Sequence, residues 1–324
     1  MALKPKDENH SFQIEAGIKG RKRGHSFEKI LTVAINELDL TTIPTAILSH
    51  IETGNPAALL LGYVEQKLGL KIVKVKAWWL GGLATAQDGD ILLDDEGNVV
   101  KKCKSDIMLD IHTADEFKRI GVSVKTCNKN TPTNAQMYLT TARAFCKLLI
   151  ANGIPCSESA IKAMSMFCGD AGFRPLDNMT SDELKLRKSD PRRYYWEEMP
   201  PKVRAEWENI FMEYQDKITM LLFQKAYKND PFAPEFLLHQ TVKYESFDDC
   251  KIALFTMEEI VALSREHCRF VLSPYVIRKG TYKSDPATHF APRLGFIQFQ
   301  QFGNSQNKTQ LQFNLKAGYF NCLT

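Results

Sequence analysis

Alternating apolar and polar positions dominate the chain between residues 70 and 128. Such alternation is typical of β-strands with one buried face. It predicts a strand over 70–80, a hairpin over 89–111 that turns at 96–98, and a further strand over 119–127 after a short polar turn. We therefore expect this part of the chain to form a β-sheet.

Helical periodicity flanks the alternating segment on both sides. Apolar residues at helical spacing predict an amphipathic helix that begins near Ser26, after a polar lead-in over 1–20. Residues 42–70 are predicted to be helical with a break near residue 54, and residues 131–153 are predicted to form a further helix. A helix, then strands, then a helix is the expected order of elements in this half.

The second half of the chain is first mainly helical and then mixed. Helices are predicted over 157–168, 203–227 and 257–268. The last segment alternates again on both sides of the turn-like 303–308, which predicts a β-ribbon. We expect residues 1–155 to form one part and residues 156–324 a helical and β-ribbon part, either as two domains or as one continuous domain.

Composition adds few restrictions to this picture. The chain has 324 residues, is 44% hydrophobic and 25% charged, and carries a net charge of +4. These values are ordinary for a globular protein, and the mild positive charge permits a polyanionic partner without pointing to one. The eight cysteines lack the spacing of a structural zinc site, and no apolar run is long enough to cross a membrane. We expect a cytoplasmic protein with no membrane partner.

Two charged residues stand out on the predicted strands. If the turn is centred near residues 115–116, antiparallel pairing puts Asp106 opposite Lys125 and Asp110 opposite Gly121. This register favours Asp106 over Asp110 as the partner of Lys125. A carboxylate can hold a divalent metal ion and a lysine can stabilise charge or help to deprotonate water, as phosphodiester hydrolysis requires. The alternative is a solvated hairpin whose charges have no catalytic role.

These residues resemble a known catalytic motif. Ser105-Asp106 and Ser123-Val124-Lys125 are similar to the two halves of the motif of the PD-(D/E)xK nuclease superfamily, and of its type II restriction endonucleases in particular. Glu28, within the segment GHSFE, matches a glutamate that many members place on the preceding helix. Two positions depart from the motif: Ser105 replaces a proline, and Ser123 replaces an acid that would bind metal. Glu28, or less favourably Asp110, must then compensate.

The resemblance implies a fold and a division of roles. The fold is α/β (α+β), a restriction-endonuclease-like core with a central mixed β-sheet flanked by helices, a largely helical insertion and a C-terminal β-ribbon. Asp106, Glu28 and the Val124 carbonyl would bind Mg²⁺, Lys125 would orient or activate water, and Ser123 would hold a metal-bound water. Residues 1–155 would be the nuclease core, and the rest would serve DNA recognition and dimerisation.

The implied activity is Mg²⁺-dependent hydrolysis of double-stranded DNA at a short specific site, which we expect to be palindromic. A homodimer would match the two-fold symmetry of such a site. A cognate DNA methyltransferase is expected in the same host, as part of a restriction-modification system, without necessarily contacting this protein. Two other hypotheses remain open: a non-catalytic DNA-binding protein that retains the nuclease fold, favoured by Ser123, and a repair or defence nuclease without sequence choice.

Further candidate DNA contacts lie outside the motif. The basic run at 20–23 is either a solvated loop or a phosphate contact. The segment 187–201 contains arginines, which can bind phosphates, and aromatic rings, on which bases can stack. A surface loop is an equally good interpretation of this segment. Amide side chains can pair bidentately with adenine, although they are also common on solvent-facing strands. Gln136, after the motif, would face the scissile phosphate. The full set of candidates is Arg21, Arg23, Gln136, Arg192, Arg193, Gln298, Gln300, Gln310, Gln312 and Asn314.

Overall fold

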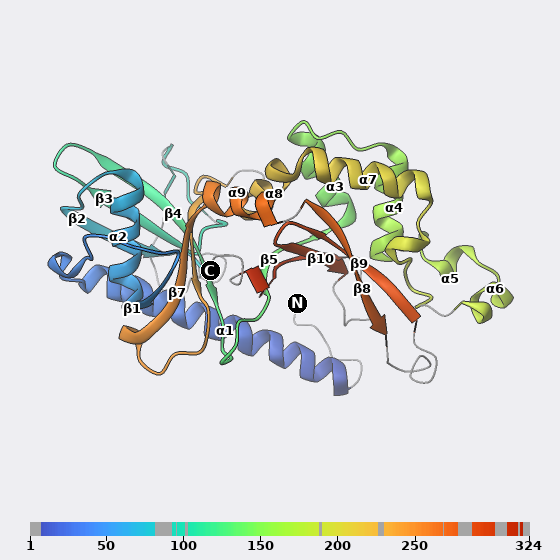
Figure 1. The fold of residues 1–324 in the computed structure, drawn as a ribbon, viewed down its shortest axis with the longest axis horizontal. Helices are drawn as coiled ribbons and strands as arrows, with labels where there is room; N and C mark the ends of the chain where they lie inside the picture. The colour runs from blue at the N-terminus through green and yellow to red at the C-terminus, as the bar shows by residue number, and fades with distance from the viewer. Residues whose placement is uncertain are drawn as a thin grey trace. The chain divides into compact units, whose positions relative to one another are not determined.

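Two compact units make up the chain (Figure 1). The structure is a computed structural model, which describes residues 8–81, 93–94, 96–100, 103–187, 190–225, 230–267, 269–277, 287–301, 310–316 and 318–319. The first unit contains the chain up to Ala135 and Met220–Ile260, and the second contains Gln136–Thr219 and Val261–Tyr319. This interleaving differs from the predicted division at residue 155. The roles predicted for the second part, DNA recognition and dimerisation, stay predictions.

A six-stranded mixed sheet forms the centre of the first unit, with the strand order β1-β7-β6-β4-β3-β2. Its strands are β1 (Ile51–Gly54), β2 (Lys74–Trp79), β3 (Ile107–His112), β4 (Phe117–Thr126), β6 (Pro234–Gln240) and β7 (Cys250–Thr256). The β4–β6 pair is parallel, and the other pairs are antiparallel. A parallel pair in the middle requires a long connection between β4 and β6. One part of the second unit, Gln136–Thr219, lies in that connection, and the other part follows β7.

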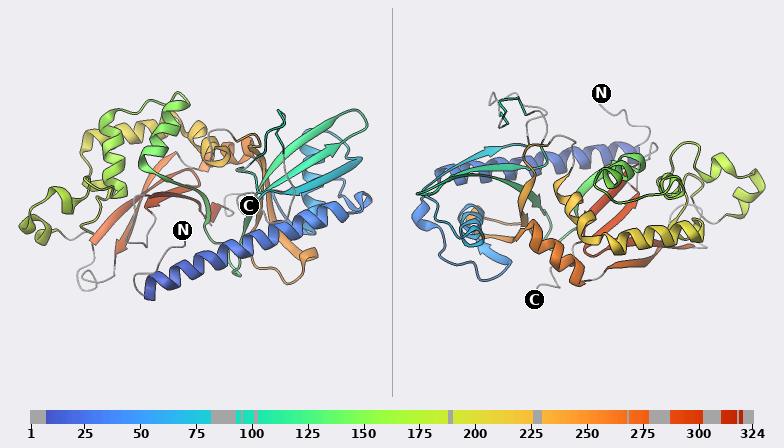
Figure 2. Two further views of the ribbon diagram at one scale, coloured as in Figure 1. Left: turned by 180° about the vertical axis from the view of Figure 1, so that it is seen from behind. Right: turned by 90° about the horizontal axis from the view of Figure 1, so that it is seen from above.

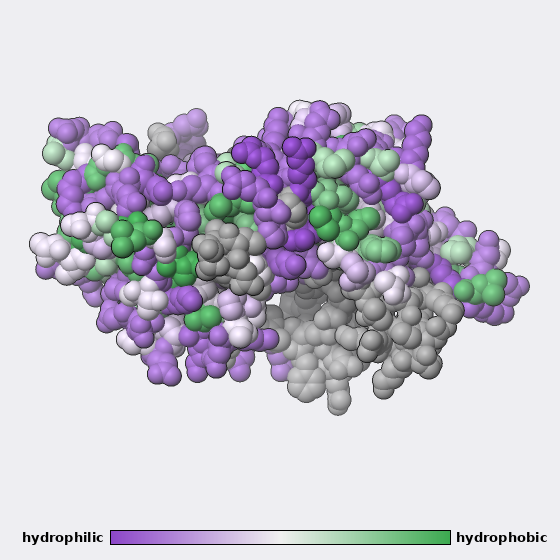
Figure 3. All heavy atoms as spheres, in the orientation of Figure 1, coloured by the Kyte–Doolittle hydropathy of each residue, from purple (hydrophilic) through white to green (hydrophobic). Residues whose placement is uncertain are grey.

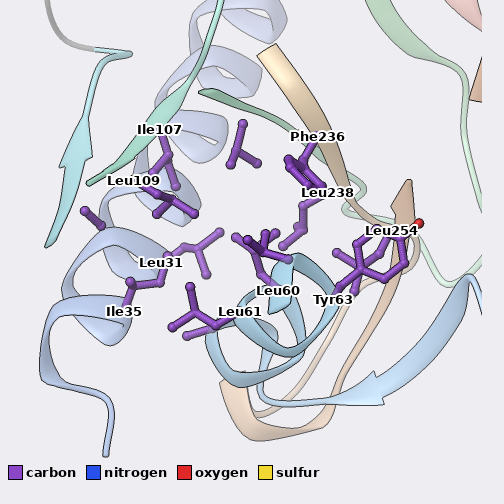
Figure 4. Close-up of a cluster of buried hydrophobic side chains, with 14 of the residues drawn as sticks. Leu31, Ile35, Leu60, Leu61, Tyr63, Ile107, Leu109, Phe236, Leu238 and Leu254 are labelled. Atoms are coloured by element: carbon purple, nitrogen blue, oxygen red, sulfur yellow. The ribbon is translucent and has the colours of Figure 1, made fainter. Parts of the chain in front are cut away.

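The core of the first unit lies between one face of this sheet and two helices, α1 (Glu8–Glu37) and α2 (Pro56–Leu68) (Figure 4). Leu31 of α1 and Leu60 of α2 are fully buried against Ile107, Leu109 and Leu238 of the strands. The alternation seen in the sequence places these apolar side chains on a single face. The same unit can be followed in two further views (Figure 2).

The β3–β4 hairpin has a register that differs from the predicted one by two residues. Asp110 lies opposite Arg119, not opposite Gly121, and the prediction that Asp106 lies directly opposite Lys125 is wrong. Because side chains alternate with a period of two along a strand, an even shift keeps each side chain on its expected face. The Asp106 side chain therefore still points to the face that carries Lys125.

Helix α1 begins much earlier than predicted. It runs from Glu8 rather than from near Ser26, so Arg21 and Arg23 lie within a helix instead of a loop. The apolar stripe, with Phe27 buried, occupies only the second half of this helix. The polar first half has no apolar periodicity, which is the signal from which a helix is predicted.

Three other predicted helices are partly wrong. Residues 45–48 have no regular structure, and the chain then enters β1 at Ile51. Within 131–153, the first half is strand β5 (Ala135–Thr141), and the helix α3 (Ala142–Ala151) starts only afterwards, capped by Thr141. Pairing of β5 with the distant β11 outweighs the local helical pattern. The predicted helix over 203–227 is interrupted at Tyr214.

The second unit combines helices with a five-stranded sheet of order β5-β11-β10-β9-β8. Its remaining strands are β8 (Phe270–Ile277), β9 (Ala287–Leu294), β10 (Ile297–Gln301) and β11 (Gln310–Leu315). Phe313 of β11 packs on Phe145 of α3 with ring centres 4.9 Å apart, and Phe299 packs at the same distance on Phe211. The predicted helical insertion and C-terminal ribbon are thus both present.

The remaining helices are η1 (Leu40–Thr42), α4 (Glu158–Cys168), α5 (Pro175–Asn178), α6 (Ser181–Leu186), η2 (Trp196–Glu198), α7 (Pro201–Glu213), α8 (Gln215–Gln224), η3 (Phe247–Asp249) and α9 (Met257–His267). They include α8 and α9, each of which runs from one unit into the other. Thr180 and Glu183 form a capping box at the start of α6. The face shown in Figure 3 is mainly hydrophilic, with separate hydrophobic patches. Within the described ranges, no helix is both long and apolar enough to cross a membrane.

Candidate active site

Asp106 and Lys125 are in direct contact at the carboxyl-terminal part of β4. Lys125 Nζ lies 3.1 Å from Asp106 Oδ2 and donates a second hydrogen bond of 2.8 Å to the carbonyl of Val124. The same Oδ2 accepts hydrogen bonds from the Val124 backbone N–H at 2.7 Å and from the Ser123 hydroxyl at 3.2 Å. The structure therefore brings together the residues that match both halves of the motif.

Asp106 is fixed by the backbone that surrounds it. It directly precedes β3, and its N–H donates to the carbonyl of Val122 at 2.9 Å. The preceding Ser105 is buried and donates its hydroxyl to the carbonyl of Phe232 at 2.7 Å. A Cβ atom at Gly121 would lie 2.2 Å from Ser105 Oγ and 2.7 Å from the backbone carbonyl oxygen of Ala233, so this position requires glycine. The serine that replaces the proline of the motif thus anchors the aspartate by a hydrogen bond.

Glu28 approaches the site from α1. Its carboxylate is buried and accepts a 3.0 Å hydrogen bond at Oε2 from the indole nitrogen of Trp79. Burial, followed by the negative charge of Asp106, raises the pKa of Glu28 from 4.5 to about 7, against the opposing effects of Trp79 and Lys125. Glu28 is therefore close enough to interact electrostatically with both charged members of the pair.

Asp110, the alternative acid, has other partners. Arg119 Nε donates to Asp110 Oδ1 at 2.8 Å, and the Trp78 indole donates to Oδ2 at 2.9 Å. Both oxygens of this buried carboxylate are thus engaged in an ion pair and a hydrogen bond. Four residues of extended strand also separate it from Asp106, which is about 13 Å of backbone. We assign Asp110 a structural role.

The site offers carboxylate and carbonyl oxygens, which are the type of ligand that binds Mg²⁺. Among the described residues, no group of three or more His, Cys, Asp or Glu side chains is arranged to hold a metal ion. Mg²⁺ commonly uses only one or two carboxylates and completes its octahedron with water and substrate phosphate. Asp106 and Glu28 fit that requirement. The Val124 carbonyl, predicted as a third ligand, accepts the hydrogen bond from Lys125 in this structure.

Three residues near the site were not predicted. The pKa of Lys104 is lowered to about 8 by burial and then by the positive charge of Lys125. His239 of β6 lies beside Lys125 in the parallel register, and burial, with the charge of Lys125, lowers its pKa to about 3. Trp79 holds Glu28. Only Lys104 could have been noticed from its closeness to Asp106 in sequence, since the others depend on long-range pairing.

The predicted DNA contacts belong mainly to the second unit. Gln136 lies on β5, not in a helix as predicted, and its Oε1 accepts a 3.0 Å hydrogen bond from Gln312 Nε2. In the β10–β11 ribbon, Gln298 lies opposite Asn314, and Gln300 lies opposite Gln312. Amides on three neighbouring strands are thus aligned across the sheet. Gln310 is the first residue of β11.

The two candidate arginines of the 187–201 segment, Arg192 and Arg193, have protein partners. Arg192 forms an ion pair with Asp190 at 2.7 Å, although its side chain remains largely exposed. The Arg193 guanidinium lies 4.6 Å from the ring centre of Tyr195, in a cation–π contact. The exposed guanidinium of Arg192 can still reach a phosphate, whereas Arg193 serves the packing of this segment.

Among known proteins, a likeness to this chain is found in the fold. No family model and no curated protein sequence matches the chain. A solved structure, the restriction endonuclease MspI in complex with its cognate DNA, matches with a TM-score of 0.51 over 93% of this chain and 92% of that chain, at 9% sequence identity. At this identity the likeness concerns the fold. The chain therefore has a restriction-endonuclease-like fold, with a central mixed sheet flanked by helices.

Proposed function

We propose that this chain is a type II restriction endonuclease, which hydrolyses phosphodiester bonds of double-stranded DNA at a short palindromic site in the presence of Mg²⁺. The contact between Asp106 and Lys125, on the central sheet of a restriction-endonuclease-like fold, carries this proposal. Glu28 adds a second carboxylate within electrostatic range. Both charges are largely shielded from solvent and are hydrogen-bonded to one another, which supports a defined site over a solvated hairpin.

Each residue of the site would have its own role in phosphodiester hydrolysis. Bound Mg²⁺ would polarise the phosphate and lower the pKa of an attacking water. Asp106 and Glu28 would hold the ion through their carboxylate oxygens. Lys125, fixed by Asp106 and by the Val124 carbonyl, would offset the charge that develops on the phosphate and orient the water.

Ser123 has a supporting role in this scheme. Its hydroxyl is buried and donates to Asp106 Oδ2, so it helps to orient the metal-binding carboxylate. A serine cannot replace the charge of the acid that the motif has at this position. The site therefore depends on Glu28 for its second negative charge, and Glu28 must lose its proton before it can bind metal.

The partners follow from the same proposal. Double-stranded DNA is the substrate, a homodimer matches a palindromic site, and a DNA methyltransferase of the same host protects its genome. The aligned amides of β5, β10 and β11 in the second unit are the candidates for base contacts. The solved structure that shares the fold contains its cognate DNA, which supports DNA as the ligand.

Plasmid cleavage with and without Mg²⁺, followed by sequencing of the DNA ends, tests the proposal. Discrete fragments whose ends share one sequence are the expected result. A smear with random ends would identify a nuclease without sequence choice. Intact DNA that is nevertheless bound by the protein would identify a non-catalytic DNA-binding protein, the interpretation that the serine at position 123 favours. The Asp106→Asn variant is the negative control, since it keeps the shape of the side chain but loses its charge.

A further inference from the structure

The segment Trp79–Gly81, at the end of β2, contacts the carboxylate of Glu28 and the backbone of Asp106, the two acids of the proposed metal site. We infer that this segment is a positioning element, which sets the carboxylate of Glu28 relative to Asp106 so that the two can share one divalent cation. The inference rests on the proposed function of the site. Three neighbouring residues contribute to it by three different contacts.

Trp79 contributes a directed hydrogen bond. Its indole nitrogen donates to Glu28 Oε2 at 3.0 Å, and a Trp ring has only this one donor. The indole itself is held by neighbours on α1, because the His25 ring packs edge-on against it with centres 5.8 Å apart and Lys29 Nζ lies 5.6 Å from its ring centre. The donor therefore has a fixed direction, and it selects which oxygen of Glu28 faces the protein.

Leu80 connects the same segment to the main chain of Asp106. Its backbone N–H donates to the backbone carbonyl of Asp106 at 2.9 Å, and its side chain is buried. This bond continues the β2–β3 pairing one residue beyond Trp79. The main chain that carries the Trp79 indole is thus tied directly to the main chain that carries the Asp106 carboxylate.

Gly81 leaves room for the Glu28 carboxylate because it has no side chain. A Cβ atom at this position would lie 2.2 Å from Glu28 Oε2 and 3.0 Å from the indole nitrogen of Trp79. The Glu28 carboxylate therefore passes directly over the glycine. The obstructed atom is the end of a flexible side chain, so an alanine here would displace the carboxylate without forcing the backbone apart.

The neighbouring Trp78 shows what the same type of contact does outside the site. It points to the opposite face of β2, where its indole donates to Asp110 at 2.9 Å, and Asp110 is paired with Arg119. The two adjacent tryptophans therefore make equivalent hydrogen bonds to two different carboxylates. Trp78 is a matched control for Trp79, because its substitution removes the same kind of bond from a structural ion pair.

Loss of these contacts should lower the affinity of the site for Mg²⁺. Groups that orient metal ligands without touching the metal typically contribute 10–100-fold to affinity. Trp79→Phe keeps an aromatic ring but removes the donor, and Gly81→Ala displaces the carboxylate. Each should weaken Mg²⁺ binding about 10-fold or more, whereas Trp78→Phe should leave it within about twofold of the unsubstituted protein.

Two measurements test the inference on the full-length chain. The first is calorimetric titration of the metal-free protein with Mg²⁺ alone, and the second is the Mg²⁺ concentration that gives half-maximal plasmid cleavage. The expected result is a parallel increase of both values in Trp79→Phe and Gly81→Ala, with maximal rates largely restored at high Mg²⁺. A loss of thermal stability without a change in Mg²⁺ dependence would overturn the inference, and so would an equal effect in Trp78→Phe.

The two proposals can fail separately. If the unsubstituted protein cuts DNA with Mg²⁺ and both Trp79→Phe and Gly81→Ala need no more Mg²⁺ than it does, the inference about the segment is wrong and the proposed function stands. If the unsubstituted protein neither binds Mg²⁺ nor cuts DNA, the proposed function is wrong, and the segment then has no metal site to organise.

Discussion

Glu28→Gln should stabilise the metal-free protein at alkaline pH. Glu28 is buried beside the negative charge of Asp106, and these two effects raise its pKa from 4.5 to about 7. A glutamine has nearly the same shape, and its amide oxygen can still accept the hydrogen bond from the Trp79 indole. The substitution therefore removes the charge while the packing is retained.

The pH range follows from the direction of the pKa change. Below pH 4.5, Glu28 is protonated in both the folded and the unfolded chain, so its ionisation does not affect stability. Between pH 4.5 and about 7, the unfolded chain loses the proton and the folded chain keeps it, so the free energy of unfolding falls as pH rises. Above pH 7 Glu28 is ionised in both states, and burial of its charge lowers the free energy of unfolding by its full cost. At about 1.4 kcal/mol per pKa unit, this cost is about 3 kcal/mol.

Calorimetric unfolding in the presence of a chelator measures the effect. We expect Glu28→Gln and the unsubstituted protein to differ little near pH 4.5, and the variant to melt about 4 °C above the unsubstituted protein at pH 8. Glu15→Gln is the control, since Glu15 lies on the same helix and is exposed. Saturating Mg²⁺ should reduce the difference, because it stabilises the chain that retains both carboxylates.

The reasoning would be refuted if Glu28→Gln were equally or less stable than the unsubstituted protein at pH 8 without metal. It would also be refuted by a stability difference of constant size from pH 4.5 to pH 8, since that would indicate a change in packing rather than in ionisation.

Three further predictions concern neighbouring residues. Arg119→Ala should cost about 2 kcal/mol in urea unfolding, because it leaves Asp110 buried without its ion-pair partner; a cost below 0.5 kcal/mol would contradict this ~2 kcal/mol expectation. Ser123→Ala should slow cleavage by no more than about 10-fold, since the Val124 N–H and Lys125 still hold Asp106; complete loss of activity would show a direct catalytic role for the hydroxyl. Replacing the amides of β11 by alanine should relax or abolish site choice, as read from sequenced DNA ends, and unchanged specificity would leave the ribbon a structural role only. These amides are Gln310, Gln312 and Asn314.

The sequence predicts the hairpin and its charged pair well, for a physical reason. Alternation with a period of two determines which side chains share a face, and this does not depend on the exact turn. Here the turn lies one residue earlier than predicted, so every pairing moved by two residues, and Asp106 and Lys125 still meet. The pairing of Asp110 with Arg119 would have followed from the correct register.

Other features depend on contacts between distant parts of the chain. Trp79 and Glu28 are joined across 51 positions in sequence, and no local pattern indicates that they meet. His239 lies beside Lys125 only because β6 pairs in parallel with β4 after a long connection that contains Gln136–Thr219. Strand β5 was predicted as helix because the apolar spacing of α3 continues into it, whereas its pairing with β11 decides its conformation.

Plasmid cleavage by Lys125→Ala, compared with Lys118→Ala, tests the central claim most directly. Lys118 lies on the same strand in an ion pair with Glu116, while Lys125 contacts Asp106. Asp106 keeps its hydrogen bonds from Val124 and Ser123 in the Lys125 variant, so the chain should still fold and bind DNA. The account predicts that Lys125→Ala cleaves at least about 100-fold more slowly, with Lys118→Ala unchanged. Cleavage by Lys125→Ala at the rate of the unsubstituted protein would contradict it.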